Sequence, residues 1–255
     1  MTNHNAYDGY LRWKAWDSQS FGEFSKADAA YFASEMRAAG QSTHPPLRIL
    51  EIGFGQGRFA RWAIAQGHEY VGTEILPELV ASAQTSGITT IAPSEIKNRV
   101  PASSLDLVVA FDVLEHLELS NILDHLRLFR ELLKPGGCVL ARIPSGDSPF
   151  GRATQYGDIT HRVVLGSFAI GQIAELSGLT VRRISAPTIP LLGVGIKQSI
   201  RRLGIKLLQD AITGLIRMTF HFNCKTVVNA SMVFVLSRPL DAIAPANSNP
   251  TKGNL

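Results

Sequence analysis

Short apolar runs alternate with longer segments of helical spacing along most of this chain. The apolar runs, which predict β-strands, cover residues 47–52, 70–74, 89–91, 105–111, 138–143, 180–184 and 230–236. Segments whose apolar residues recur three and four positions apart predict helices at residues 26–39, 58–66, 77–85, 121–133 and 167–177. Strands that alternate with helices in this way form a mostly parallel sheet with helices on both faces. The pattern therefore predicts a doubly wound α/β fold with a seven-stranded sheet.

Three parts of the chain fall outside this alternation. The first part is residues 1–45, which hold a polar arm with interspersed aromatics and the first helix. The alternating segments that follow, residues 46–238, form the predicted α/β domain. A helical insertion is expected at about residues 190–222, before the last strand. Residues 239–255 contain small polar residues, Pro and Gly without periodicity, which predicts a disordered tail.

The composition is typical of a globular protein with a substantial core. A chain of 255 residues, 45% apolar and 18% charged, can bury its surface as one domain. Its net charge of +4 is small and most Lys and Arg are scattered, so we expect no nucleic-acid partner. The two cysteines, the lack of a signal-peptide pattern and the lack of an apolar run of about 20 residues together predict a cytoplasmic protein.

A glycine-rich loop follows the first predicted strand. Gly53, Gly55 and Gly57 lie where strand 47–52 turns into a helix, a place where a ligand can approach the bare backbone. A dinucleotide-binding loop would have its third glycine at the next position, which is Arg58, so a nicotinamide-dependent oxidoreductase is disfavoured. Glu74 ends the second predicted strand, where a carboxylate can accept hydrogen bonds from both hydroxyls of a ribose.

These features occur together with two further motifs, and the whole set resembles the class I S-adenosylmethionine-dependent methyltransferase family. The motifs are Leu50-Glu-Ile-Gly-Phe-Gly-Gln-Gly57, Glu74, Phe111-Asp-Val-Leu-Glu-His116 and Leu133-Lys-Pro-Gly-Gly137, within residues 47–185. The resemblance implies a Rossmann-like fold with an antiparallel last strand and S-adenosyl-L-methionine as cofactor. It also implies site residues: Glu51 with Gly53, Gly55 and Gly57 for the methionine part, Glu74 for the ribose, and Ile75 and Asp112 beside the cofactor. Many members place an Asp against the adenine after the third strand, where this chain offers Ser94 or Glu95 instead.

Two histidines are candidates for a catalytic base, which methyl transfer to a hydroxyl requires. His116 follows the strand at 105–111, at the edge where parallel sheets bind ligands. His161 lies in the loop after the fifth strand, where Asp158 can orient it. Packing beside the cofactor, or an Asx or helix-capping turn before the helix at 167–177, explains these residues equally well.

A metal site was also considered, because some metal-assisted methyltransferases resemble this chain in their carboxylate and histidine set. The residues concerned are Asp112, Glu115, His116 and His161. Cofactor contact and the charge preference of a helix N-terminus account for the two carboxylates as well as a metal does. We therefore expect no metal.

The acceptor is indicated only by a weaker resemblance. Tyr156-Gly-Asp-Ile-Thr-His161 and the aromatic arm Tyr10-Leu-Arg-Trp-Lys-Ala-Trp16 are similar to bacterial methyltransferases associated with surface-polysaccharide synthesis. The resemblance implies O-methylation of a small-molecule, sugar or glycan hydroxyl, and a role in polysaccharide biosynthesis. The alternative from another functional class is a methyltransferase-like protein that is non-catalytic or membrane-associated.

Residues 194–220 form a basic amphipathic segment. Apolar residues recur there at helical spacing, with Lys197, Arg201, Arg202, Lys206 and Arg217 between them. Such a stripe more often packs on protein, as a lid or a dimer face, and this is the interpretation that we favour. The alternative is peripheral contact with an anionic surface, which would place the protein at the inner membrane. The sequence leaves the oligomeric state open.

Overall fold

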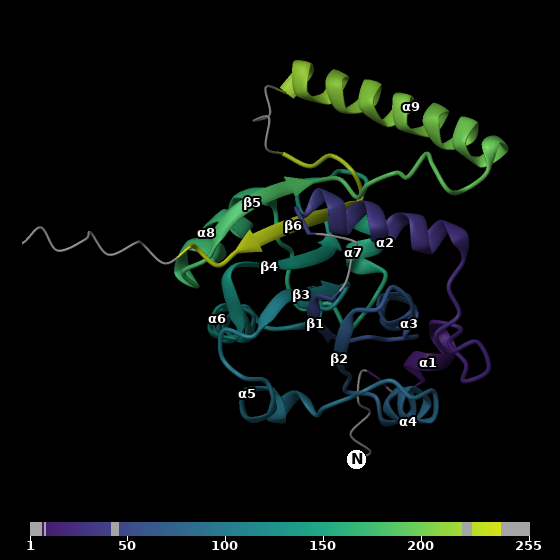
Figure 1. Cartoon of the computed structure of the whole chain (residues 1–255). Helices are drawn as coiled ribbons and strands as arrows, with labels where there is room; N and C mark the ends of the chain where they lie inside the picture. The colour runs from purple at the N-terminus through teal and green to yellow at the C-terminus, as the bar shows by residue number, and fades with distance from the viewer. Residues whose placement is uncertain (1–6, 8, 42–45, 221–225, 241–255) are drawn as a thin grey trace, which may run out of the picture.

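A mixed six-stranded sheet forms the centre of the molecule (Figure 1). The structure is a computed structural model that describes residues 7, 9–41, 46–220 and 226–240. The strands lie in the order β2-β1-β3-β4-β6-β5, the first four parallel and β6 antiparallel to both of its neighbours. Their bounds are Arg48–Ile52 (β1), Glu69–Thr73 (β2), Leu105–Phe111 (β3), Leu133–Pro144 (β4), Thr180–Ser185 (β5) and Ser231–Ser237 (β6). The antiparallel last strand is confirmed.

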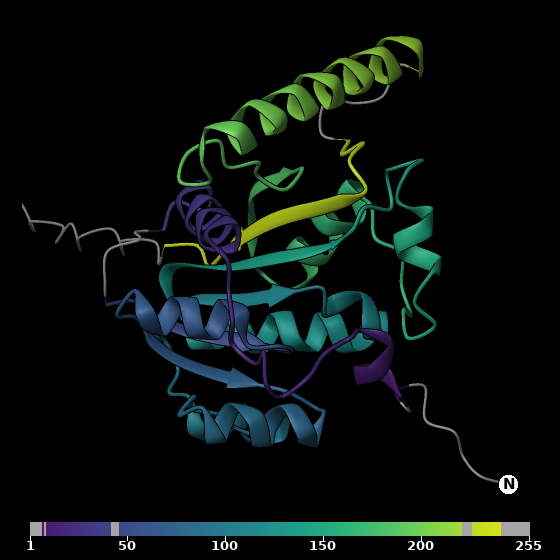
Figure 2. The same cartoon turned by 90° about the vertical axis from the view of Figure 1, so that its right-hand side faces the viewer.

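Helices cover both faces of this sheet, as the alternating pattern predicts (Figure 2). One face packs against α2 (Lys26–Ala38) and α3 (Arg58–Ala65), and the other against α5 (Ile96–Arg99), α6 (Leu119–Leu132) and α8 (Ser167–Leu176). The remaining helical elements are α1 (Tyr10–Trp13), α4 (Pro77–Thr85), η1 (Pro93–Glu95), η2 (Leu114–His116), α7 (Arg152–Tyr156) and α9 (Ile196–Phe220). Successive residues of the central strands point to opposite faces and fill two separate cores, so the chain is doubly wound.

The sheet has six strands where the sequence predicts seven, because the segment 89–91 does not form a strand. Thr90 makes a single bridge with Gly72. The chain then turns at Pro93, the first residue of η1, and a proline cannot continue a strand since it has no N–H to donate. The strand predicted at 138–143 is longer, because Leu133 already pairs with Leu105 before an irregularity in the ladder.

The helical insertion before the last strand is confirmed as α9. None of its residues is buried, and Figures 1 and 2 show it standing apart from the sheet and its covering helices. The apolar stripe therefore does not pack on its own chain as a lid, and the other form of the favoured interpretation, a dimer face, stays a prediction. Among the residues described, no helix is both long enough and apolar enough to cross a membrane. Residues 241–255, most of the predicted disordered tail, lie outside the described part of the chain.

Candidate active site at the carboxyl edge of the sheet

The parallel strands end around one cavity of about 400 Å³. Open parallel sheets bind their ligands at this edge, because loops that leave neighbouring strands in opposite directions open a crevice there. Of the predicted site residues, Glu51, Gly53, Gly55, Glu74, Ile75, Asp112 and His116 line this cavity. Its walls also include aromatic side chains from the leading arm and from the helix that follows it: Tyr7, Tyr10, Trp16, Tyr31 and Phe32.

The loop after β1 keeps its backbone bare for steric reasons. Gly53 has a φ of +64°, and a Cβ there would lie 2.6 Å from Cγ2 of Val113. At Gly57, with a φ of +72°, a Cβ would lie 2.6 Å from Cζ of Phe21. Glycine is therefore required at both positions, and the loop brings the backbone of Gly55 to the cavity wall.

Glu74, just after β2, is held by the backbone of the two loops that meet at the cavity. Its Oε2 accepts a hydrogen bond from the N–H of Gly55 at 3.0 Å. Its Oε1 accepts from the N–H groups of Ile75 at 2.7 Å and Leu76 at 3.2 Å. These bonds fix the carboxylate beside the glycine loop, and its oxygens keep lone pairs for further donors.

Glu51 is a buried acid at the bottom of the site. It is 3% exposed, and its Oε2 accepts a hydrogen bond of 2.6 Å from the hydroxyl of Tyr70. Burial raises the pKa of Glu51 to about 8, against the opposing effect of that bond, and the charge of Glu74 adds to the rise. The side chain thus favours its protonated form in the absence of a nearby cation.

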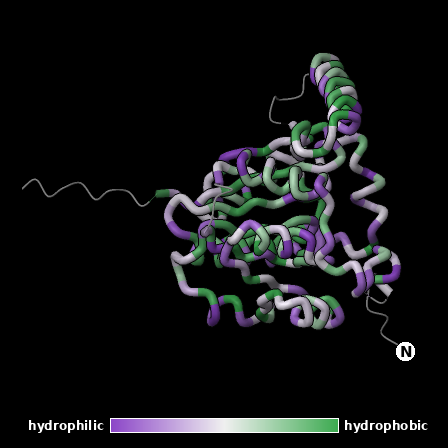
Figure 3. Tube along the Cα trace, turned by 45° about the vertical axis from the view of Figure 1, so that its right-hand side comes forward, coloured by the Kyte–Doolittle hydropathy of each residue, from purple (hydrophilic) through white to green (hydrophobic). Residues whose placement is uncertain are grey.

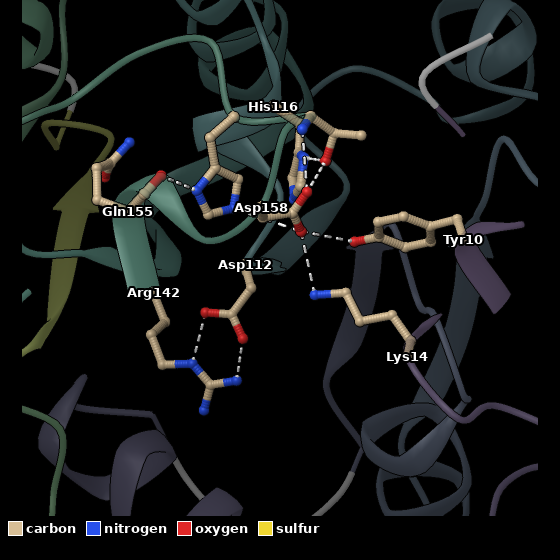
Figure 4. A network of polar contacts seen from close by, with 9 residues as sticks. Tyr10, Lys14, Asp112, His116, Arg142, Gln155 and Asp158 are labelled. Carbon is tan, nitrogen blue, oxygen red and sulfur yellow. Dashed lines mark hydrogen bonds and ion pairs between the residues drawn. The ribbon is translucent and has the colours of Figure 1, made fainter. Parts of the chain in front are cut away.

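Asp112 forms an ion pair with Arg142, a residue of β4 that the sequence analysis did not select. Nε of Arg142 donates to Oδ1 of Asp112 at 2.9 Å, and Nη2 donates to Oδ2 (Figure 4). The guanidinium also lies 5.3 Å from the ring centre of Phe111 and bonds the hydroxyl of Tyr31 at 3.1 Å. Asp112 has a positive φ of 56°, a costly conformation that this two-pronged pair helps to hold.

His116 is connected to Asp158 through the hydroxyl of Thr160 (Figure 4). An ionised carboxylate only accepts, so the Thr160 hydroxyl gives its one hydrogen to Oδ1 of Asp158. The hydroxyl must then accept from Nδ1 of His116, which lies 2.8 Å away. This assigns the proton of the neutral imidazole to Nδ1 and leaves the lone pair on Nε2.

The charges around this chain of bonds favour a neutral imidazole and an ionised carboxylate. Burial lowers the pKa of His116 below its usual 6.5, and the neighbouring His161 lowers it further. Burial acts to raise the pKa of Asp158, but the hydrogen bonds from Thr160 and the ammonium of Lys14, 3.3 Å away, lower it overall. The hydroxyl of Tyr10 also donates to Asp158, at 3.5 Å, so the leading arm reaches this network.

His161 is placed behind His116 and outside the cavity lining. Its Nδ1 lies 2.9 Å from the carbonyl oxygen of Gln155, which can only accept, so Nδ1 carries the proton. Its Nε2 lies 3.8 Å from Oδ2 of Asp158, beyond hydrogen-bonding distance. The partner that orients His161 is therefore Gln155. Asp158 instead accepts a hydrogen bond from the backbone N–H of Thr160, which forms an Asx turn.

The residues considered as a metal set are arranged as a trio. One donor atom each from Glu115, His116 and His161 lies within 4.8 Å of the others. Burial, and then the charge of Asp112, raise the pKa of the Glu115 carboxyl. Asp112 is held by Arg142 and does not join the trio. The hydrogen bonds to protein hold Nδ1 of each imidazole and leave both Nε2 atoms available, as in histidines that bind metals, so the expectation of no metal stays a prediction.

Three residues of the candidate site escaped the sequence analysis, and neither candidate for the adenine contact lines the cavity. Arg142 is the one charged residue in the apolar strand 138–143, a signal that could have drawn attention to it. Lys14 and Thr160 stood inside quoted motifs without a role. Ser94 and Glu95 are exposed and do not line the cavity, whereas Pro93 and Ile96, on either side of them, do.

A methyltransferase-domain family matches residues 24–184, which is more than half of the chain. Ubiquinone biosynthesis O-methyltransferases from two strains of Cereibacter sphaeroides are 31% identical over 100 residues, covering 37% of this chain. That stretch is 40% of the length of each of those proteins.

Solved structures with the same fold include a SAM-dependent methyltransferase from Archaeoglobus fulgidus. It has a TM-score of 0.61 and 17% identity, and the match covers 91% of this chain and 100% of that one. A phosphoethanolamine N-methyltransferase from Haemonchus contortus, in complex with S-adenosyl-L-methionine, has a TM-score of 0.60 and 18% identity, over 93% and 61% of the two chains. At these identities the likeness concerns the fold.

Proposed function

The chain belongs to the methyltransferase-domain family, and from this premise we propose that it transfers the methyl group of S-adenosyl-L-methionine to a hydroxyl oxygen. The observation that carries the proposal is the shared cavity. It joins the bare glycine loop and Glu74, which suit a nucleoside with a charged tail, to His116, which suits a hydroxyl. The site suits a dinucleotide less well, because Arg58 lines the cavity at the position where a dinucleotide-binding loop needs its third glycine.

The residues present fit this cofactor. Gly53, Gly55 and Gly57, with Glu51 beneath them, would hold the methionine part, and Glu74 would hold the ribose hydroxyls. Ile75 and Asp112 would border the cofactor. When bound, the cofactor supplies an electrophilic methyl group on a sulfonium sulfur. The protein then has to align the acceptor and remove its proton.

His116 is the base in this proposal. Its Nε2 carries the lone pair and would take the proton of the acceptor hydroxyl, whose oxygen would gain the methyl group as the S–CH₃ bond breaks and a neutral thioether leaves. Thr160 and Asp158 hold the ring in that tautomer, and the carboxylate stabilises the imidazolium that results. His161, which is outside the cavity lining, acts as a positioning residue by packing against His116 at 4.7 Å between ring centres.

The acceptor in this proposal is a small molecule, a sugar or a glycan, with a role in polysaccharide biosynthesis. The aromatic walls of the cavity support an acceptor with a flat or apolar face, which includes the C–H face of a sugar ring. The Cereibacter relatives are O-methyltransferases by name, which supports oxygen as the acceptor atom.

The test is methyl transfer from labelled S-adenosyl-L-methionine to a panel of sugar nucleotides, free glycans and catechols, with mass spectrometry of the products. We expect a methyl ether on one acceptor class. Tight cofactor binding with no transfer to any acceptor would favour the non-catalytic alternative. Binding of NADH in preference to S-adenosyl-L-methionine would favour an oxidoreductase and overturn the proposal.

Cofactor binding is expected to release protons from Glu51. At pH 7 a carboxyl with a pKa of about 8 is mostly protonated, and the cationic methionine part would lower that pKa again. Calorimetry at pH 7 in buffers of different ionisation enthalpy should therefore show release of about one proton per site. Glu51→Gln should abolish the release, and Glu69→Gln, at an exposed carboxylate on β2, should leave it unchanged. Heats that do not depend on the buffer in the wild type would contradict this assignment.

The same pKa sets how the stability of the free protein depends on pH. The protonated Glu51 contributes fully below the ordinary value of 4.5, and this contribution is lost as the pH rises toward 8.

Thr160→Val is expected to lower kcat about tenfold, because the isosteric side chain cannot link His116 to Asp158. Thr160→Ser keeps the hydroxyl and should restore most of the rate. The pH dependence of kcat is the decisive measurement, since loss of the link should shift its acidic limb while KM for the cofactor stays the same. A valine variant that also weakens cofactor binding would indicate a structural role instead.

A further inference from the structure

The helix α9 is exposed, and its apolar residues do not pack on its own chain. It runs for 25 residues from Ile196 to Phe220 without a buried side chain. None of its residues lines the cavity of the active site. Figure 3 shows apolar residues recurring along it at the outer edge of the molecule.

The side of α9 that faces the rest of the chain is largely polar. Arg202 donates to the carbonyl of Pro190 at 2.9 Å, and Arg217 donates to that of Thr226 at 2.7 Å. The hydroxyl of Ser199 donates to the carbonyl that follows Pro190, in the segment that leads into the helix. The half-buried residues of the helix are Ser199, Arg202, Thr213, Ile216 and Arg217. Four of these five are polar, so polar groups anchor the helix.

Another side of α9, about 120° around the helix axis from the anchored side, is an apolar stripe open to solvent. We define the stripe as Ile196, Ile200, Leu203, Leu207 and Met218. Successive members are three, four or eleven residues apart, which places them on one face of a helix. All five are exposed, from 45% at Leu203 to 82% at Ile196. In a globular protein this face would be expected to point inward.

Basic residues flank this stripe on both sides. At about 100° per residue, Lys197 lies about 60° beyond one edge, with Arg201 further round, and Lys206 lies about 60° beyond the other edge. The whole helix has five Lys or Arg and one acid, Asp210, which pairs with Lys206 at 2.5 Å. Long basic side chains on the shoulders of an apolar face can reach phosphate groups while the face enters the acyl boundary.

We propose that α9 lies in the interface of an anionic membrane, with the stripe buried among the lipids. Its charges decide between lipid and a second copy of the chain, because a copy would set these basic shoulders against one another, whereas anionic headgroups complement them. The helix lies on the membrane and does not cross it, since it is not apolar enough to span a bilayer. The proposal does not depend on the chemistry of the active site.

The experiment is co-sedimentation of the whole chain with lipid vesicles. Vesicles of phosphatidylcholine and phosphatidylglycerol in equal parts should bind the protein, and vesicles of phosphatidylcholine alone should bind it much less. The double variant Leu203→Asp with Leu207→Asp should weaken binding about tenfold or more, because it charges the face that enters the lipid.

The matched control is Gln198→Asp with Gln209→Asp, which adds the same charge to exposed positions away from the stripe. This control should bind more tightly than the stripe variant, and the affinity of both variants for S-adenosyl-L-methionine or NADH, whichever the wild type binds, should be unchanged. Equal loss of vesicle binding in the two variants, or no binding by the wild type, would overturn the proposal. So would a dimer, seen by sedimentation without lipid, that the stripe variant dissociates, because a second copy would then cover this face.

Discussion

His116→Ala is expected to lower kcat by about 10²- to 10⁴-fold, the range for loss of a general base. The reason is geometric, because His116 lines the cavity and its Nε2 carries the free lone pair. Cofactor affinity should change little, since the glycine loop and Glu74 are separate from this ring. Two quantities are measured: kcat with the acceptor that the panel identifies, and the dissociation constant of S-adenosyl-L-methionine.

The pH profile separates His116 from its neighbour. With a pKa lowered by burial and by His161, the base stays neutral below pH 6.5, so the acidic limb of kcat/KM should lie below that value. His161→Ala should retain most of the activity and move the limb upward, because it removes the second cause of the lowered pKa. A larger loss of kcat in His161→Ala than in His116→Ala would reverse the assignment of the base.

Glu74→Ala is expected to weaken cofactor binding by about 10- to 100-fold, since a hydrogen bond to a charged group contributes roughly 1.5–3 kcal/mol. The variant removes the acceptor for two ribose hydroxyls and the acceptor of three backbone N–H groups. Calorimetry with S-adenosyl-L-methionine measures the effect.

Two further variants show whether the loss belongs to the ligand or to the loops. Glu74→Gln keeps one oxygen acceptor and should bind with intermediate affinity. Glu69→Ala removes a carboxylate from β2, the strand that precedes Glu74, where it forms an exposed pair with Arg48, and should bind as the wild type does. An affinity of Glu74→Ala equal to that of the wild type would remove Glu74 from the cofactor site.

Most of the fold could be predicted from the sequence, because its strands and helices have clear periodicity. The strand 105–111 and the helix 77–85 have the predicted bounds. The prediction of a strand at 89–91 is wrong because three apolar and β-branched residues indicate a strand locally, while the proline just beyond them prevents a longer ladder. The surroundings of α9 could not be predicted, because periodicity reveals that a stripe exists but not what covers it.

The candidate site was predictable only where local position determines it. Glu74 and His116 each follow a strand, and the carboxyl edges of parallel strands meet, so both were expected at one cavity. The link from His116 through Thr160 joins residues 44 positions apart, and the contact of Arg142 with Tyr31 spans 111 positions. No local pattern reports such contacts, which is why Thr160 and Arg142 were not selected.

The contact of Tyr10 with Asp158 joins residues 148 positions apart and has a consequence for folding. A chain must close a loop of that length before the contact can form, and the entropy of closure is lost before the contact contributes anything. The arm has no buried residue in α1, and beside Tyr10 and Lys14 its apolar packing comes from Leu11 and Trp16, which are only partly buried, so less apolar burial drives the docking of this part than of the core helices. The network around Asp158 should therefore assemble last, after the sheet and its helices have formed, and the arm should be the first part to detach when the protein is mildly destabilised.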